Sequence, residues 1–144
     1  MSTPQEIKNE IMTELNANTD LQSFGIMAVF EGLRVGVSDL TYPYIALELV
    51  ENNEIPNSVQ THVASKIVFN VIGVVLVKDV DVQLNAMLSI ETAIKKCFSN
   101  NVQLNGKAHN INFGKTQYDY EAWPLRVVTV PVEVDYRQNF LTRT

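Results

Sequence analysis

The hydrophobic pattern of the chain is dominated by one long run of β-forming residues. Residues 61–78 read THVASKIVFNVIGVVLVK, and at about 3.3 Å per residue a strand of this length spans on the order of 60 Å. Polar residues share the face of His62 in the first half. Both faces are apolar from Val71 to Val77, which is typical of a strand covered on two sides. We expect the following helix to cover one side and a second copy of the chain to cover the other.

The N-terminal residues carry the signals of an amphipathic helix. Thr3 is expected as the N-cap, Pro4 occupies the first helical position, and Glu6 is placed to complete a capping box. The predicted apolar face carries Ile7, Ile11 and Leu15. This pattern predicts a helix that packs on the sheet and ends in the polar segment 16–20.

A second helix is predicted after the long strand, from a stripe of apolar residues at helical spacing. The stripe consists of Leu84, Met87, Ile90, Ile94, Cys97 and Phe98. Glu91 and Lys95 are four residues apart, a spacing that allows an ion pair along the helix. Ser89, Thr92 and Lys96 fall on the opposite side, which we therefore expect to be solvated.

Residues 42–51 predict another strand, with Ile45, Leu47 and Leu49 on one face. Turn-forming residues, NNEIPNSVQ, separate it from the long strand, so an antiparallel hairpin with a sizeable tip is expected. A short strand is predicted at 25–30, and Asn105-Gly106 predicts a two-residue β-hairpin.

The last predicted strand, LRVVTVPVEVDYR, alternates regularly. Its buried face is expected to hold Val128, Val130, Val132, Val134 and Tyr136. Pro131 lacks a backbone N–H, so this strand is expected either at an edge of the sheet or irregular at that residue. The order of elements predicts an α+β fold: a mixed or antiparallel sheet, an N-terminal helix, a second helix packed on one face, and a projecting hairpin.

Length and composition indicate one ordinary domain over residues 1–144, with a short arm at 138–144. The chain has 144 residues, 46% of them hydrophobic and 19% charged. A chain of this size can form a hydrophobic core without disulfides or a structural metal. Cys97 is the single cysteine, so no intrachain disulfide is possible and a reducing compartment is expected. No membrane span or leader is evident, and the chain is expected to be cytosolic or released from the cytosol.

The net charge of −5 is unevenly distributed along the chain. Residues 1–60 carry two cations and nine carboxylates, a balance of −7, whereas the remainder carries nine cations and seven carboxylates, a balance of +2. This pattern argues against a domain that clasps nucleic acid. It fits head-to-tail association of complementary surfaces, and it equally fits a merely acidic soluble protein.

The sequence offers no set of residues for catalysis, a cofactor or a metal. His62 and His109 have no partners at metal-binding spacing. Cys97 lies on an apolar stripe, where a buried and inert thiol is the common case. We therefore predict a protein that is not an enzyme, with no cofactor.

Three features, together with the two-sided apolar part of the long strand, instead predict contact surfaces. The predicted interface residues are Glu51, Glu54, Ile55, Val71, Val75, Tyr118, Tyr120, Trp123, Phe140 and Leu141. Aromatic residues such as Tyr118 and Tyr120 are enriched in interface hot spots, although Trp123 equally suits the core beneath the last strand. The hairpin tip is either a docking knob or a plain turn, and the terminal arm is either disordered or packed on a neighbour.

The N-terminal helix, the projecting hairpin, the helix on the sheet and the closing strand RVVTVPVEVDYR together resemble the tail terminator (tail completion) proteins of long-tailed bacteriophages. The similarity covers nearly the whole chain, but it lies in the order of the predicted elements, their lengths and their general hydrophobic pattern. Because no family motif matches a position in this chain, no functional residue is carried over.

The resemblance implies a structural virion protein, assembled in the host cytoplasm, that forms a hexameric ring. Such a ring caps the tail tube, stops its polymerisation and meets the head-completion or neck protein, while DNA passes through the lumen without specific binding. The hairpin would face the lumen or the adjoining ring, with the second helix outward. The alternatives are another neck ring component such as a head-closure protein, a tail tube subunit, or, from a different class, a small-ligand or regulatory dimeric module.

Overall fold

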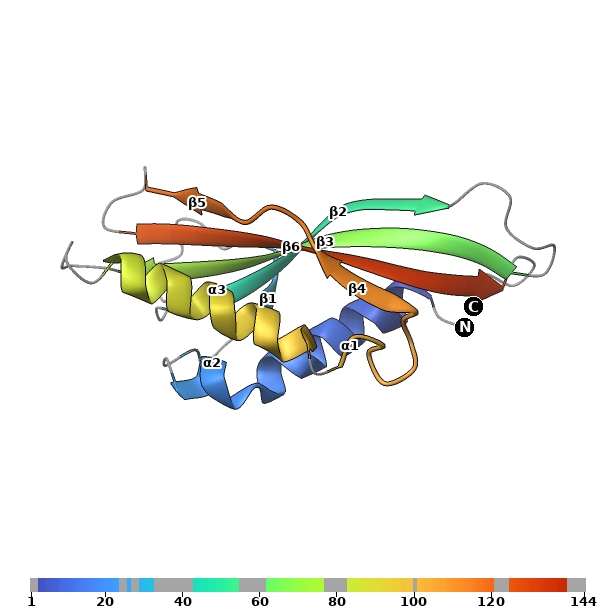
Figure 1. The fold of residues 1–144 in the computed structure, drawn as a ribbon, viewed down its shortest axis with the longest axis horizontal. Helices are drawn as coiled ribbons and strands as arrows, with labels where there is room; N and C mark the ends of the chain where they lie inside the picture. Colours follow the sequence, from blue (N-terminus) through green and yellow to red (C-terminus); the bar gives the residue numbers. More distant parts are fainter. Residues whose placement is uncertain are drawn as a thin grey trace.

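The computed structural model describes residues 3–23, 26, 29–32, 43–54, 62–76, 83–99, 101–120 and 125–139. Within these ranges the helices are α1 (Pro4–Ala17), α2 (Thr19–Ser23) and α3 (Gln83–Ser99). The strands are β1 (Val29–Glu31), β2 (Tyr44–Glu54), β3 (His62–Leu76), β4 (Asn110–Phe113), β5 (Gln117–Asp119) and β6 (Leu125–Asn139). The α+β fold is as predicted, and the helices lie together on one side of the sheet (Figure 1).

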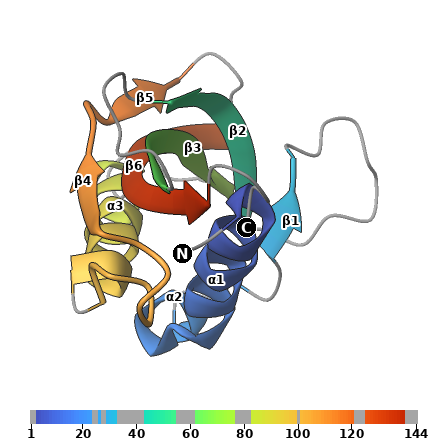
Figure 2. The ribbon, with the colours of Figure 1, turned by 90° about the vertical axis from the view of Figure 1, so that its right-hand side faces the viewer.

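The described strands form one sheet of six strands in the order β1-β2-β3-β6-β4, with β5 also paired to β6. The pairs are antiparallel except for β1 and β2, which run parallel. The outer neighbour of β6 is therefore split into β4 at one end and β5 at the other. Viewed along its long axis, the sheet curves over α1 and α3 from β4 on one side to β1 on the other (Figure 2).

The long strand is confirmed as β3, but both of its apolar faces are buried within a single chain. Val71 and Val75 belong to the main core beside the helices, where they are 0% and 8% exposed. On the opposite face, Ile72 and Val74 are 5% and 2% exposed and form a second cluster with Tyr44 and Ala46. Residues 71–75 therefore need no second copy to cover them, whereas Leu76 is 39% exposed and Val77 lies outside the described residues.

Both predicted amphipathic helices form and bury their apolar faces. Thr3 caps α1 by accepting a hydrogen bond from the backbone N–H of Glu6 at 3.2 Å, and Lys95 pairs with Glu91 at 2.8 Å. The predicted stripe of α3 is buried from Met87 to Phe98, but Leu84, at its start, is 56% exposed. The core thus begins one turn later on α3 than its apolar pattern predicted.

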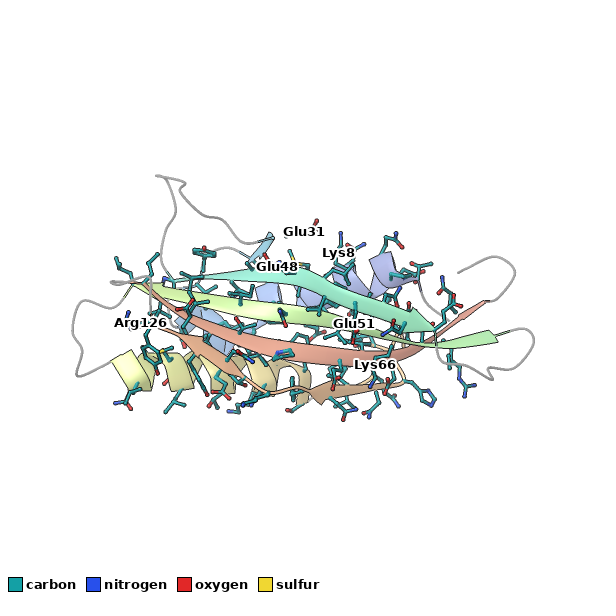
Figure 3. All side chains as sticks on the ribbon, turned by 90° about the horizontal axis from the view of Figure 1, so that it is seen from above. Lys8, Glu31, Glu48, Glu51, Lys66 and Arg126 are labelled. Atoms are coloured by element: carbon teal, nitrogen blue, oxygen red, sulfur yellow. The ribbon has the colours of Figure 1, made fainter. Side chains whose placement is uncertain are left out.

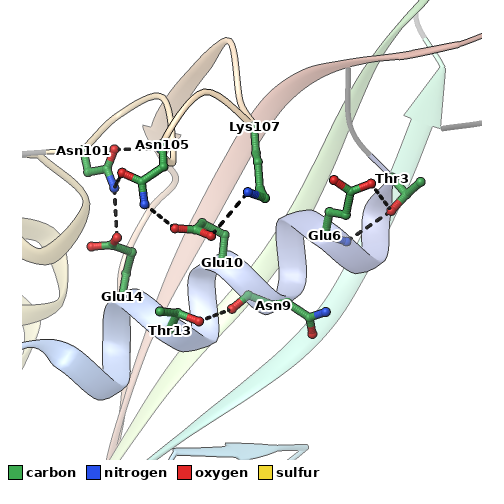
Figure 4. Close-up of polar contacts among 9 residues, drawn as sticks. All are labelled: Thr3, Glu6, Asn9, Glu10, Thr13, Glu14, Asn101, Asn105 and Lys107. Atoms are coloured by element: carbon green, nitrogen blue, oxygen red, sulfur yellow. Dashed lines mark hydrogen bonds and ion pairs between the residues drawn. The ribbon is translucent and has the colours of Figure 1, made fainter.

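The predicted hairpin at Asn105-Gly106 is wrong, since residues 102–107 form turns. Leu104 and Asn105 adopt φ values of 47° and 57° and Gly106 a φ of 88°, so the left-handed backbone that makes Asn-Gly a hairpin signal is used here after a helix instead. The turns contact α1 (Figure 4): Asn105 donates to Glu10, and the Lys107 Nζ lies 3.8 Å from the other oxygen of Glu10. Because α1 supplies these contacts, the segment is held against a helix and not against a strand.

Pro131 lies in the middle of β6, which is an interior strand and not an edge. It pairs with Asn70 of β3, and its carbonyl accepts a hydrogen bond from the N–H of Gly114 at 2.9 Å. Gly114 follows β4 and precedes β5, so the missing N–H of Pro131 faces the gap between the two outer strands. β6 itself keeps its register with β3 through Pro131, so neither predicted alternative describes it, and the irregularity lies in its outer neighbour.

Candidate interaction surface

The outer face of the sheet, defined as the face opposite the helices, changes character along its length. At the end where β1 and β5 lie, it holds the apolar cluster of Tyr44, Ala46, Ile72 and Val74. At the other end, which we call the charged end, the strand pairing brings polar and charged side chains onto it. These side chains are Glu48, Glu51, Asn53, Lys66, Asn70, Glu133, Asp135 and Arg137.

The charged end is acidic overall, with four carboxylates and two cations. Glu48, Glu51 and Lys66 are seen from above in Figure 3. The Lys66 Nζ lies 3.9 Å from the Glu133 carboxylate, and both side chains are partly exposed, so this pair contributes little free energy. The excess of carboxylates makes this surface unfavourable for phosphate binding.

The outermost part of β2 is exposed on both of its faces. Residues 49–54 are all exposed, and Leu49 and Val50 are 62% and 53% exposed. A bulge between Leu49 and Glu51 interrupts the pairing with β3. Leu49 shares a face with Ile45 and Leu47, as predicted, since it pairs with the buried Phe69, but unlike them it is exposed. β1 pairs with β2 only as far as Leu47.

A hollow of about 420 Å³ lies beside this exposed segment. Its walls include Lys8 of α1, Glu31 of β1 and the apolar side chains of Leu47, Leu49 and Phe69. An ion pair of 2.8 Å between Lys8 and Glu31 borders it. The hollow and the exposed pair Leu49 and Val50 are features that the sequence prediction missed, and the only signal for them is the polar run ENNE that follows.

Tyr118 and Tyr120 are 40% and 43% exposed, and each also has a contact within the chain. The Tyr118 hydroxyl donates to Glu91 of α3, which raises the pKa of the tyrosine. The guanidinium of Arg126 lies 5.3 Å from the centre of the Tyr120 ring and donates to the Tyr120 carbonyl at 3.0 Å. Both tyrosines therefore fix β5 to the rest of the fold and leave part of each ring exposed.

The structure brings only some of the predicted contact residues to one surface. Glu51 and Glu54 lie on the exposed part of β2, whereas Val71 and Val75 are in the core and have no surface to offer. Tyr118 and Tyr120 are at the other end of the sheet. Ile55, Trp123, Phe140 and Leu141 lie outside the described residues.

Reactive groups are few within the described ranges. Burial raises the pKa of the Cys97 thiol to about 12, the nearby charge of Glu14 adds to the increase, and a hydrogen bond with Asn18 opposes it. The thiol is therefore uncharged at neutral pH and a poor nucleophile. In the same ranges, no three His, Cys, Asp or Glu residues are grouped to hold a metal, and no helix has the length and apolarity to cross a membrane.

The fold has a counterpart among solved structures. A chain of the virion of a native gene transfer agent (GTA) particle superposes with a TM-score of 0.58, covering 88% of this chain and 91% of that chain at 14% sequence identity. At this identity the match shows a shared fold. The sequence itself matches no family model, and it matches no curated protein.

Proposed function

We propose that this chain is a structural protein of a phage-like virion, and that it forms the hexameric ring that ends the tail tube and joins it to the neck. The observation that carries the proposal is the fold shared over 88% of the chain with a protein of a GTA virion. The order of elements that resembles tail terminator proteins is the order found in the structure. Both therefore support the same class of assembly.

The charge distribution suits a ring through which DNA passes. If the helices lie on the outside of the ring, the outer face of the sheet, which is the face opposite the helices, points inward and lines the lumen. The acidic charged end then faces the DNA. Four carboxylates against two cations repel phosphate and remove the counterion-release term that would make DNA adhere. In this role the protein guides the DNA without binding it.

The experiment is a tube-length assay with the purified chain and the tail tube protein of the same particle. We expect light scattering to report a monomer or hexamer of the chain alone, and electron microscopy to show shorter tubes when the chain is added. Continued polymerisation of the chain into tubes would identify it as a tube subunit instead. A stable dimer with unchanged tube length would favour a ligand or regulatory module and overturn the proposal.

A further inference from the structure

Among the described strands, two stretches of open sheet edge lie at the charged end of the molecule, in addition to the outer edges of β1 and β5 towards the other end. β1 pairs with residues 45–47 of β2 only, and β5 pairs with residues 127–129 of β6 only. Outside these two short pairings, none of the described strands pairs with the outer edge of β2 from Leu49 to Asn53. None pairs with the outer edge of β4 either. Such edges carry backbone N–H and C=O groups that bond to a further strand.

The two open edges lie at the same height along the strands. One row of paired residues runs across the sheet through Asn53, Lys66, Asp135 and Asn110. A second row runs through Glu51, Val68, Glu133 and Asn112. In a ring whose axis is parallel to the strands, neighbouring copies are related by a rotation with no shift along that axis. The β2 edge of one copy therefore meets the β4 edge of the next at the same level.

The directions of the strands also suit this contact. β2 is antiparallel to β3, β3 to β6 and β6 to β4, so β2 and β4 run in opposite directions. When β4 of one copy meets β2 of the next, the antiparallel alternation continues unbroken. Two different edges are used, which makes the contact head-to-tail and allows a ring to close.

The two edges differ in charge: β4 itself is uncharged and is followed by Lys115, while Lys107, which precedes it, lies 3.8 Å from Glu10. Residues 48–54 of β2 contain three glutamates and no cation, whereas residues 101–118 contain Lys107 and Lys115 and no carboxylate. Two β2 edges would bring like charges together, which disfavours a twofold contact. The β2 edge is therefore better matched to the β4 edge than to another copy of itself.

We propose that residues 49–53 of β2 add to the outer edge of β4 (Asn110–Phe113) of a second copy, so that the sheets of neighbouring copies form one continuous antiparallel sheet. This inference rests on the proposed ring, whose subunit contact it specifies. Leu49 and Val50, exposed in the single chain, are covered in the contact. Backbone hydrogen bonds supply the affinity, and the glutamates of β2 disfavour a second β2 edge as the partner.

Cysteine cross-linking tests the contact directly. N53C and N110C place exposed thiols on the same face in one row of the sheet, and a short bis-maleimide spans both opposite and diagonal neighbours. We expect a two-chain adduct in the mixture of the two variants and none in either variant alone. Mixing N110C with S99C, an exposed position on α3, is the matched control and should give no adduct.

The neighbouring row repeats the test with E51C and N112C, so a folding defect in one variant does not decide the result. No adduct in either mixture overturns the inference, and so does an N53C adduct with itself. Light scattering on the same samples separates the two proposals. A hexamer without adducts leaves the ring standing and removes this contact, whereas an adduct in a chain that never shortens tubes keeps the contact and removes the tail function.

Discussion

Gly73 of β3 and Ile90 of α3 are in such close contact that a Cβ atom on Gly73 would lie 2.8 Å from Ile90 Cγ2. Ile90 is buried, at 3% exposure, and Cγ2 is attached directly to its Cβ, so the methyl cannot move away by a simple rotation of the chain end. The glycine therefore sets the distance at which α3 packs on the long strand. Its role is to make room for the helix and not to permit a special backbone angle.

Gly73→Ala is expected to destabilise the fold. Alanine suits a strand better than glycine by roughly 0.5–1 kcal/mol, but overpacking a buried contact costs about 1–3 kcal/mol, so the net free energy of unfolding should fall. Urea denaturation measures it. Ile90→Ala removes the clashing methyl, so the double variant should lose less than the sum of the two single losses. Additive losses would show that the contact is not the cause.

Cys97 should make the stability of the protein fall in alkaline solution. Burial, with the charge of Glu14, raises its pKa from an ordinary 9.0 to about 12 in the folded chain. A raised folded pKa means that the contribution is complete below pH 9 and is lost as the pH rises from 9 towards 12. The measurement is the free energy of unfolding of wild type and Cys97→Ala against pH.

The difference between these two proteins should be constant up to about pH 8 and should then shift against the wild type, by the linkage relation. Tyrosines and lysines also titrate at high pH, but they are common to both proteins and cancel in the difference. The Sγ of Cys97 also donates to the Glu14 carbonyl at 3.2 Å, so thiol reagents should react only on unfolding. Rapid labelling of the native chain would contradict the buried position.

Tyr118→Phe is expected to raise the pKa of Glu91. Burial acts to raise this pKa, but hydrogen bonds from Lys95 and Tyr118 outweigh it, and the pKa lies below its usual value. A lowered folded pKa adds stability that is present above the ordinary pKa and is lost as the pH falls through the folded one. The pH midpoint of the Glu91 titration, measured by carboxyl-detected NMR, should therefore be higher in the variant than in the wild type.

The matched control is Tyr120→Phe, because Tyr120 contacts Arg126 through its ring and carbonyl. In this variant the pH midpoint of the Glu91 titration should be the same as in the wild type. If both variants shift the Glu91 midpoint equally, β5 as a whole, and not the Tyr118 hydroxyl, controls the carboxylate.

The regular parts of the fold follow directly from hydrophobic periodicity. Val128, Val130, Val132 and Val134 were predicted on one face and all are 0% exposed. Alternation records which residues share a face, but it does not record which neighbour covers that face or where the cover ends. Leu49 therefore lies on the predicted face, with Ile45 and Leu47, and is nevertheless exposed.

Pro131 shows a second limit of sequence reasoning. The rule that proline avoids interior strands assumes a continuous neighbour, and here the neighbour is broken at Gly114. A Cβ on Gly114 would lie 3.0 Å from Pro131 Cβ, so the glycine and the proline are matched in space. This relation between residues 17 positions apart (114 and 131) follows from the pairing of β4 and β5 with β6, which no local pattern reports.

Leu49→Lys should prevent ring formation without unfolding the chain. Leu49 is 62% exposed, and substitutions at such positions usually change the free energy of unfolding by less than about 0.5 kcal/mol. In the assembled ring, however, the lysine would occupy the covered edge of β2 and approach the basic segment that carries Lys107 and Lys115. Light scattering should report a monomer, and the added variant should no longer shorten tubes.

Leu84→Lys is the matched control, since Leu84 is 56% exposed but lies on α3, on the helix side of the sheet. This variant should still assemble and should shorten tubes as the wild type does. The opposite result, with Leu84→Lys monomeric and Leu49→Lys assembled, would place the subunit contact on the helices. Assembly of both variants would show that neither exposed leucine is covered in the ring, because a buried lysine without a partner is costly at any interface.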